Sequence, residues 1–206
     1  MNSTAFTTLV SLGLLLMLSS GCSGADESSA GGAGPATASG ERLLAAPPDG
    51  WKEVFSSDNP GLRMVEFIPD DQVNATWQQK ISFESSSGQP LPDPIEFLKG
   101  LSVDQSGTCD GFESFTTFSG FENGYPTTVR LMVCKNSDII NQSQVTMLKA
   151  IQGKDNFYVI SRAQRAPPLA DDAEPLSKAE IAGWSLYLKA ISLCDGSPDH
   201  PCPAES

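Results

Sequence analysis

The strongest constraint on the fold is a period-two alternation of apolar and polar residues in the second half of the chain. The alternating stretches are residues 112–121, 127–135, 144–152 and 156–162. In the second stretch, Val129, Leu131 and Val133 share one face. Alternation predicts strands, and the short connections near residues 122–124 and 153–155 favour antiparallel neighbours. The chain is therefore expected to build an antiparallel sheet from two hairpins.

The last of these strands carries apolar side chains on both faces. Phe157 and Val159 point to one side, and Tyr158 and Ile160 to the other. Because a strand at the centre of a covered sheet is buried on both faces, this pattern predicts a central strand with packing above and below it.

Three further strands and a helix are expected before the hairpins. The strand stretches are residues 51–55, 62–69 and 77–83. Asp93 is a good helix N-cap, Pro94 suits the first turn, and Glu96 occupies the capping-box position. The apolar stripe of this helix includes Leu98 and Leu101, and we interpret it as core.

A second helix is predicted near the end of the chain. Ser177 and Glu180 form a capping box, and Leu176 with Ile181 forms a hydrophobic staple around it. The apolar stripe of the helix is Ile181, Trp184, Leu188 and Ile191, with Leu186 and Leu193 offset from it. With only Lys178 and Lys189 as cations, it is not a membrane-surface helix, so it is expected to pack on the sheet.

These elements predict an α+β fold, an antiparallel sheet of about six strands flanked by two main helices. Length alone indicates a single globular domain, which we place at residues 47–194. Residues 195–206 would form a C-terminal tail fixed by a disulfide.

Four cysteines lie in this region, and they suit an oxidising compartment. Four cysteines allow three pairings, and sequence alone does not choose among them. Spacing favours Cys109–Cys134, which flank a hairpin, and Cys194–Cys202, which bracket a turn-forming segment. The chain has no Cys-x-x-Cys motif, so all four are interpreted as structural.

A fifth cysteine, Cys22, follows a short apolar run at residues 6–18 and the small residues 19–21. Such a run is too short to cross a membrane and is typical of a signal peptide. The segment resembles the bacterial lipobox, which implies a signal peptide at residues 1–21 and lipidation at Cys22. An ordinary secreted protein is the alternative.

Residues 22–46 are rich in Gly, Ser and Ala, and we expect a disordered tether there. Ser23 after the lipidated cysteine resembles an outer-membrane sorting signal. The expected location is therefore the bacterial cell envelope: an exported, lipid-anchored protein, with the outer membrane favoured and the domain facing the periplasm.

The charge balance excludes several partners. The chain has 13 basic and 25 acidic residues, a net charge of −12, and this repels nucleic acid and anionic headgroups. The acidic residues form no calcium-binding loop.

Catalytic and cofactor motifs are equally scarce. His200 is the single histidine, so a zinc triad is impossible, and a hydrolase triad would have to use it with the adjacent Asp199. No Walker or Gly-x-Gly-x-x-Gly loop is present. A pair of glycosidase carboxylates leaves no local signature, so that class stays open. We expect no catalytic residue, metal or cofactor.

The order of strands, helix, hairpins and closing helix resembles the Mog1/PsbP-like fold. The features that carry this resemblance are Gly50-Trp51 before the first strand, the helix at residues 93–101 and the Gly-Tyr-Pro hairpin at residues 124–126. The group has an α/β/α sandwich and includes lipid-anchored proteins of the LpqN type. The resemblance implies protein binding without catalysis, and it assigns no functional residue here.

Two functions follow as hypotheses. The first is a lipid-anchored, non-catalytic protein-binding or assembly-accessory module, which would use an exposed sheet edge or the loop at residues 85–92. The alternative is a carrier of a small molecule or lipid, with its pocket between sheet and helices. Four phenylalanines could line that pocket: Phe112, Phe115, Phe118 and Phe121. Their spacing of three favours instead a split between the two faces of a twisted strand.

Overall fold

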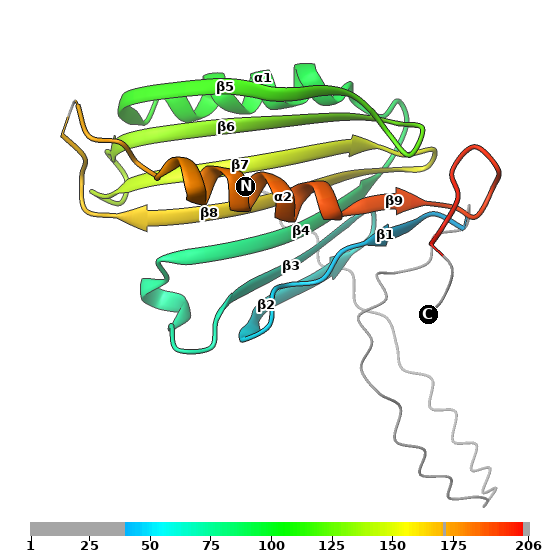
Figure 1. Ribbon diagram of the computed structural model, residues 1–206, viewed down its shortest axis with the longest axis horizontal. Coiled ribbons are helices and arrows are strands. Elements are labelled where there is room, and N and C mark those ends of the chain that lie inside the picture. Colours follow the sequence, from blue (N-terminus) through cyan, green and yellow to red (C-terminus); the bar gives the residue numbers. More distant parts are fainter. Residues whose placement is uncertain (1–39, 171, 204–206) are drawn as a thin grey trace, which may run out of the picture. The chain divides into compact units, whose positions relative to one another are not determined.

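A seven-stranded antiparallel sheet is the frame of the computed structural model, which describes residues 40–170 and 172–203. The sheet has the spatial order β2-β3-β4-β8-β7-β6-β5 (Figure 1). Its strands are β2 (Trp51–Asn59), β3 (Leu62–Pro69), β4 (Gln79–Ser87), β5 (Cys109–Glu122), β6 (Tyr125–Ser137), β7 (Ser143–Gln152) and β8 (Asn156–Ala166). Beyond these lie a short 3-10 turn, η1 (Asn74–Thr76), and a second, smaller sheet.

Two meanders make up this sheet. Strands β2 to β4 follow one another, as do β5 to β8, and the meanders join where β4 pairs with β8. In this junction Phe83 lies opposite Ile160. Strand β8 is therefore central, as its two apolar faces predicted, and β2 and β5 are the two edges.

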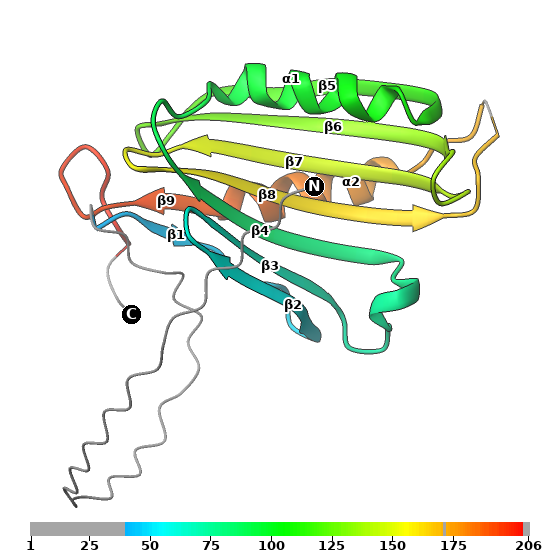
Figure 2. The same cartoon turned by 180° about the vertical axis from the view of Figure 1, so that it is seen from behind.

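Two helices, α1 (Pro94–Ser106) and α2 (Lys178–Ala190), cover opposite faces of the sheet (Figures 1 and 2). The core on the α2 side contains Tyr158 and Ile160 from β8, together with Trp184 and Leu188 of α2. The core on the α1 side contains Phe157 and Val159 from β8, packed against Leu98 of α1. The predicted α+β class and its layering are confirmed.

Both helices begin where the sequence indicated. The side chain of Asp93 accepts hydrogen bonds from the backbone N–H of Ile95 at 2.9 Å and of Glu96 at 3.1 Å. Glu96 forms an ion pair with Lys99 rather than closing a capping box. In α2 the capping box is complete, with Ser177 and Glu180 bonded in both directions.

The smaller sheet was not foreseen. It pairs β1 (Arg42–Leu44) with β9 (Ser192–Cys194), so that Leu43 lies opposite Leu193. The predicted tether, residues 22–46, is therefore wrong at its C-terminal end, because Leu43 is buried in the core. Leu193 belongs to β9 rather than to the closing helix, since α2 ends at Ala190. A three-residue strand is too short to leave a recognisable alternation in sequence.

Within residues 40–170 and 172–203, neither helix has the length and hydropathy needed to cross a membrane. Cys22, the predicted signal peptide and most of the predicted tether lie outside these residues.

Candidate functional site

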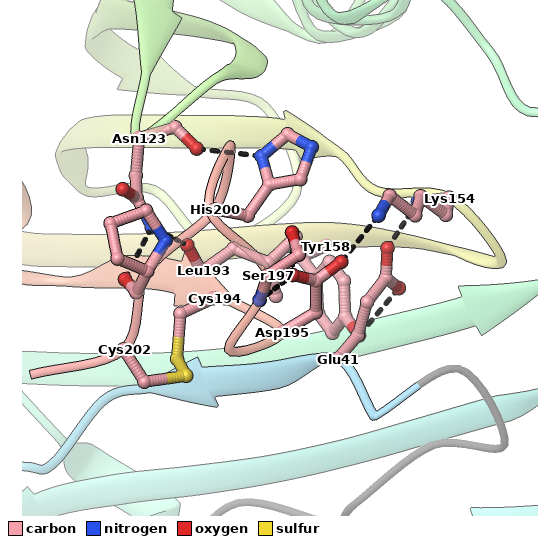
Figure 3. A network of polar contacts seen from close by, with 11 residues as sticks. Glu41, Asn123, Lys154, Tyr158, Leu193, Cys194, Asp195, Ser197, His200 and Cys202 are labelled. Atoms are coloured by element: carbon pink, nitrogen blue, oxygen red, sulfur yellow. Dashed lines mark hydrogen bonds and ion pairs between the residues drawn. A yellow bond between two sulfur atoms is a disulfide. The ribbon is translucent and has the colours of Figure 1, made fainter.

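One end of the sheet carries a cluster of polar side chains drawn from four distant parts of the chain (Figure 3). The cluster joins the segment at β1, the β5–β6 turn, the β7–β8 turn and the C-terminal loop after β9. Glu41, which directly precedes β1, is fully buried. Its carboxylate accepts a hydrogen bond from the backbone N–H of Lys154 and lies 3.4 Å from the hydroxyl of Tyr158. Burial, together with this carboxylate, raises the pKa of Tyr158.

Lys154 reaches from the same turn to the C-terminal loop. Its ammonium forms an ion pair with Asp195, whose carboxylate also accepts the backbone N–H of Ser197 at 2.9 Å and the Ser197 hydroxyl at 2.6 Å. The hydrogen bond from Lys154, reinforced by those from Ser197, holds the pKa of Asp195 well below its usual range. The same hydrogen bond to Asp195 raises the pKa of Lys154.

The C-terminal loop is also fixed to the β5–β6 turn. The Asn123 side chain donates to the backbone carbonyls of Leu193 at 2.8 Å and Pro201 at 3.0 Å. His200 places Nδ1 2.9 Å from the carbonyl oxygen of Asn123, and its ring stacks on Tyr125 with centroids 4.1 Å apart. We call the whole cluster the end latch; its residues are Glu41, Asn123, Tyr125, Lys154, Tyr158, Asp195, Ser197 and His200.

Two glycines leave the space that the close contacts of the end latch need. A Cβ atom at Gly124, where φ is +79°, would lie 2.7 Å from the ring of His200. A Cβ atom at Gly153 would lie 2.6 Å from the Glu41 carboxylate. Any larger residue at either turn would push the packed side chain away.

A buried lysine fixes α2 beside the end latch. Lys149 lies in the middle of β7 and is fully buried. It forms an ion pair with Glu122 and donates to the carbonyls of Leu188 at 2.9 Å and Ile191 at 2.6 Å. These carbonyls belong to the C-terminal end of α2, where a cation is favourable. Burial lowers the pKa of Lys149, and Glu122 opposes that shift.

In the end latch, the Ser197 hydroxyl and the His200 imidazole both bind groups of the same domain. The Ser197 hydroxyl donates to Asp195, whereas the imidazole of His200 contacts a backbone carbonyl, so these residues do not form a nucleophile–base pair. Asp199, which sequence placed beside His200, contributes its backbone to the packing around Gly124. Among the described residues no group of His, Cys, Asp and Glu is arranged to hold a metal ion.

The structure contains two disulfides. Cys109 pairs with Cys134 across β5 and β6, and Cys194 pairs with Cys202 around the C-terminal loop. Of the three pairings open to the sequence, this is the one that spacing favoured. The second disulfide closes the loop whose polar groups form the end latch.

The edge strand β5 is a different kind of candidate. Nine of its 14 residues are exposed, and within the described residues its outer side pairs with no strand. A bulge at Thr117 shifts the pairing with β6, and the Thr117 hydroxyl lies 3.3 Å from the carbonyl oxygen of Val129. We call this surface, residues Cys109–Glu122, the β5 edge.

Three phenylalanines are exposed along the β5 edge. Phe115 pairs with Leu131 and Phe118 with Val129, which places both rings on the α2 side of the sheet. Phe115 is 52 % exposed and Phe121 is 72 % exposed. Phe112 packs instead into the core on the α1 side. The four rings are therefore split between the two faces, as their spacing favoured, and they do not line a common pocket.

A small cleft lies elsewhere. It has a volume of about 230 Å³ and includes Ile139, Gln144 and Arg165 together with the Cys109–Cys134 disulfide. None of the three exposed phenylalanines lines it.

On the α1 side of the β5 edge, Arg130 of β6 extends beneath α1. It donates from Nε to the Ser102 hydroxyl, from Nη1 to the Thr116 hydroxyl and from Nη2 to the Ser114 hydroxyl, each at 2.7 Å. Sequence reasoning assigned no role to Arg130, Lys149 or Glu41. For Arg130 and Lys149 a signal did exist, since each cation stands between two apolar neighbours in a predicted strand.

Comparison with known proteins gives fold similarity. No protein-family model matches the chain, and no curated protein matches it. Among solved structures, it is similar to LpqN of Mycobacterium tuberculosis, a protein involved in cell envelope biogenesis, with a TM-score of 0.43 and 11 % identity over 74 % of this chain and 82 % of that one. It is also similar to the Ran-binding protein Mog1p of Saccharomyces cerevisiae, with a TM-score of 0.41 and 12 % identity over 73 % and 85 %. Both likenesses concern the fold, and no residue role is taken from them.

Proposed function

We propose that this protein is a lipid-anchored, non-catalytic protein-binding module of the bacterial cell envelope, and that its partner binds at the β5 edge. The observation that carries the proposal is the long edge strand β5, which has three exposed aromatic rings and whose outer side pairs with no strand among the described residues. An edge strand presents free backbone N–H and C=O groups, which an extended segment of another protein can satisfy by adding a strand.

The other edge strand is less suited to strand addition. Strand β2 carries Lys52, Glu53 and Asp58 along its nine residues, and charges on an edge discourage pairing with a further strand. The β5 edge carries its charged residues, Asp110, Glu113 and Glu122, toward its two ends, and it has none from Ser114 to Phe121. Its aromatic rings also supply apolar area, which favours recognition of another protein.

The end latch supports a structural rather than a catalytic role for the most polar part of the molecule. Its single histidine and its carboxylates are bound to neighbouring groups of the same domain. Those contacts hold β1, both hairpin turns and the C-terminal loop together. They therefore also fix the β5–β6 turn, at which the β5 edge ends.

The sequence also suggests which end of the domain would lie near the membrane. Residues 23–39 separate Cys22 from the first described residue. Because Gly40, the first of the described residues, lies beside Asp195, a lipid on Cys22 would hold the domain to the membrane by the end that carries the end latch.

Site-specific photocrosslinking tests the binding surface. A photoreactive phenylalanine analogue would replace Phe115 on β5 or, as a matched control, Phe55, which is 44 % exposed on β2. After irradiation of intact cells, we expect one adduct of defined mass from position 115 and none from position 55. Equal labelling at both positions, or none at 115, would contradict the proposed surface.

The anchor is tested by the intact mass of the membrane-extracted chain. A chain beginning at Cys22 with an acyl adduct is expected, and Cys22→Ser should release the protein from the membrane fraction. An unmodified mass for the wild-type chain would remove the anchor from the proposal and leave the binding surface to stand by itself.

A further inference from the structure

Within the part of the chain that the structure describes, the guanidinium of Arg130 donates its hydrogen bonds to neutral groups. Its three hydrogen bonds go to the hydroxyls of Ser102, Ser114 and Thr116. Among the described residues, no carboxylate forms an ion pair with it. A guanidinium has five N–H donors, so two remain after these three bonds.

Two of the bound hydroxyls are themselves donors. Ser114 and Thr116 accept from Arg130, and each keeps an O–H proton. The Ser102 hydroxyl uses its proton on the carbonyl of Leu98 at 2.8 Å. Both remaining hydroxyls lie on β5, and Thr116 is exposed. The guanidinium of Arg130 thus extends from β6 to the edge strand β5. There it lies beside two hydroxyls, and all three groups have hydrogen-bond donors.

We infer that the segment added at the β5 edge is an extended strand carrying an Asp or Glu side chain, whose carboxylate binds Arg130 beside Ser114 and Thr116. The inference rests on the proposed function. A carboxylate matches the planar donor fork of arginine and accepts hydroxyl protons as well. Apolar side chains on the other face of the same strand would contact Phe115.

The spacing of strands allows this contact. A residue opposite Ser114 or Thr116 on an added strand would have its Cβ roughly 4.5–5.5 Å from theirs. The carboxylate would then reach the donors already gathered at those hydroxyls. Because the bulge at Thr117 interrupts the edge, we expect pairing along the preceding residues, 112–116.

The overall negative charge does not prevent an acidic side chain from binding there. Exposed charges are screened beyond about 8 Å at physiological salt, so the nearby guanidinium decides the local preference. The neighbouring Glu113 lies on the opposite face of β5, where it faces Lys135 at 3.6 Å.

Selection of phage-displayed random octapeptides on the purified full-length chain tests this inference. We expect the enriched peptides to alternate apolar residues and to carry Asp or Glu at one fixed position. Synthetic versions of an enriched peptide, with that acid and with its amide, should differ about three- to tenfold in affinity. Hydrogen exchange with the peptide bound should slow in β5 and not in β2.

Arg130→Met should abolish the preference for the acid over the amide, whereas Arg63→Met, a control on β3, should leave it unchanged. Arg130→Lys distinguishes loss of the charge from misfolding. This variant keeps the positive charge and should retain part of the preference for the acid over the amide. Enrichment of strand-like peptides without an acid, or with a base, would overturn this inference and leave strand addition intact. Enrichment of no strand-like peptide, with no slowing of exchange in β5, would overturn both.

Discussion

The end latch and the β5 edge lie in the same domain, but their polar groups differ in whether they have partners within the chain. In the end latch, charges and carbonyls are bound to partners from the same chain, as Glu41 and Asp195 show. At the β5 edge, the outer backbone is unpaired within the described residues and aromatic rings are exposed. Polar groups that are hydrogen-bonded within the domain contribute to its stability, whereas unpaired backbone groups and exposed rings at its surface can bind another protein.

This comparison predicts that substitutions near the end latch change stability, while substitutions at the β5 edge change binding.

The largest effect is expected for Lys149→Met beside the end latch. The substitution keeps the apolar volume but leaves Glu122 and the carbonyls of Leu188 and Ile191 without their cation. The free energy of unfolding should fall by about 3 kcal/mol, as measured by urea denaturation. Lys99→Met, which breaks only the exposed pair with Glu96, should cost less than about 0.5 kcal/mol. Equal costs would contradict the assignment of Lys149 as a buried cap of α2.

Gly124→Ala should destabilise the protein by about 1–2 kcal/mol, since φ is positive there and the new methyl group would meet His200. The matched control is Gly183→Ala in α2, where a Cβ meets nothing within 4 Å. That change should be neutral or stabilise by up to about 1 kcal/mol, because alanine is a better helix former. Thermal denaturation of both variants measures the difference. A stable Gly124→Ala variant would mean that His200 does not pack on this turn.

The ion pair between Lys154 and Asp195 predicts a pH dependence. The folded pKa of Asp195 lies below its ordinary value of 3.8, so its contribution to stability is present above about pH 3.8. It should be lost as the pH falls further, toward the depressed pKa of the folded state. Wild type should therefore be more stable than Asp195→Asn at pH 6, and the difference should shrink progressively as the pH falls below about 3.8. A difference that does not shrink with acid would contradict this assignment.

The smallest effect on stability is expected at the β5 edge. Phe115→Ser removes a ring that is already half exposed, so the free energy of unfolding should change by less than about 1 kcal/mol. Binding of the partner should nevertheless be lost. Co-purification of the Phe115→Ser variant with the partner identified by crosslinking would measure this loss. Phe55→Ser on β2 is the control and should retain binding. A large loss of stability for Phe115→Ser would place this residue with the core instead.

The sequence predicted features that depend on neighbouring residues better than features that depend on residues far apart in the chain. The hairpins, the cap at Asp93 and the capping box at Ser177 depend on residues a few positions apart, and they appear as expected. The central place of β8 followed from its two apolar faces. Strand β1 was missed because three residues carry too little pattern, and it is held by β9 from the far end of the chain.

The candidate sites show the same division. The alternation of the phenylalanines indicated their split between faces, because side-chain direction in a strand is a local property. Their exposure depended on β5 being an edge, which follows from β4 pairing with β8 rather than with β5. The two carbonyls that Lys149 binds lie 39 and 42 residues away, and no local rule brings them together.

The sequence by itself thus determined the strands of both meanders, the start of each helix and which face most side chains take. Those properties arise from hydrogen bonds and steric preferences between near neighbours. The tertiary structure decided which strand became an open edge, which charges were buried in pairs and where Arg130 finds its hydroxyls. Those outcomes depend on contacts between residues far apart in the chain, which form only when the sheet and helices pack together.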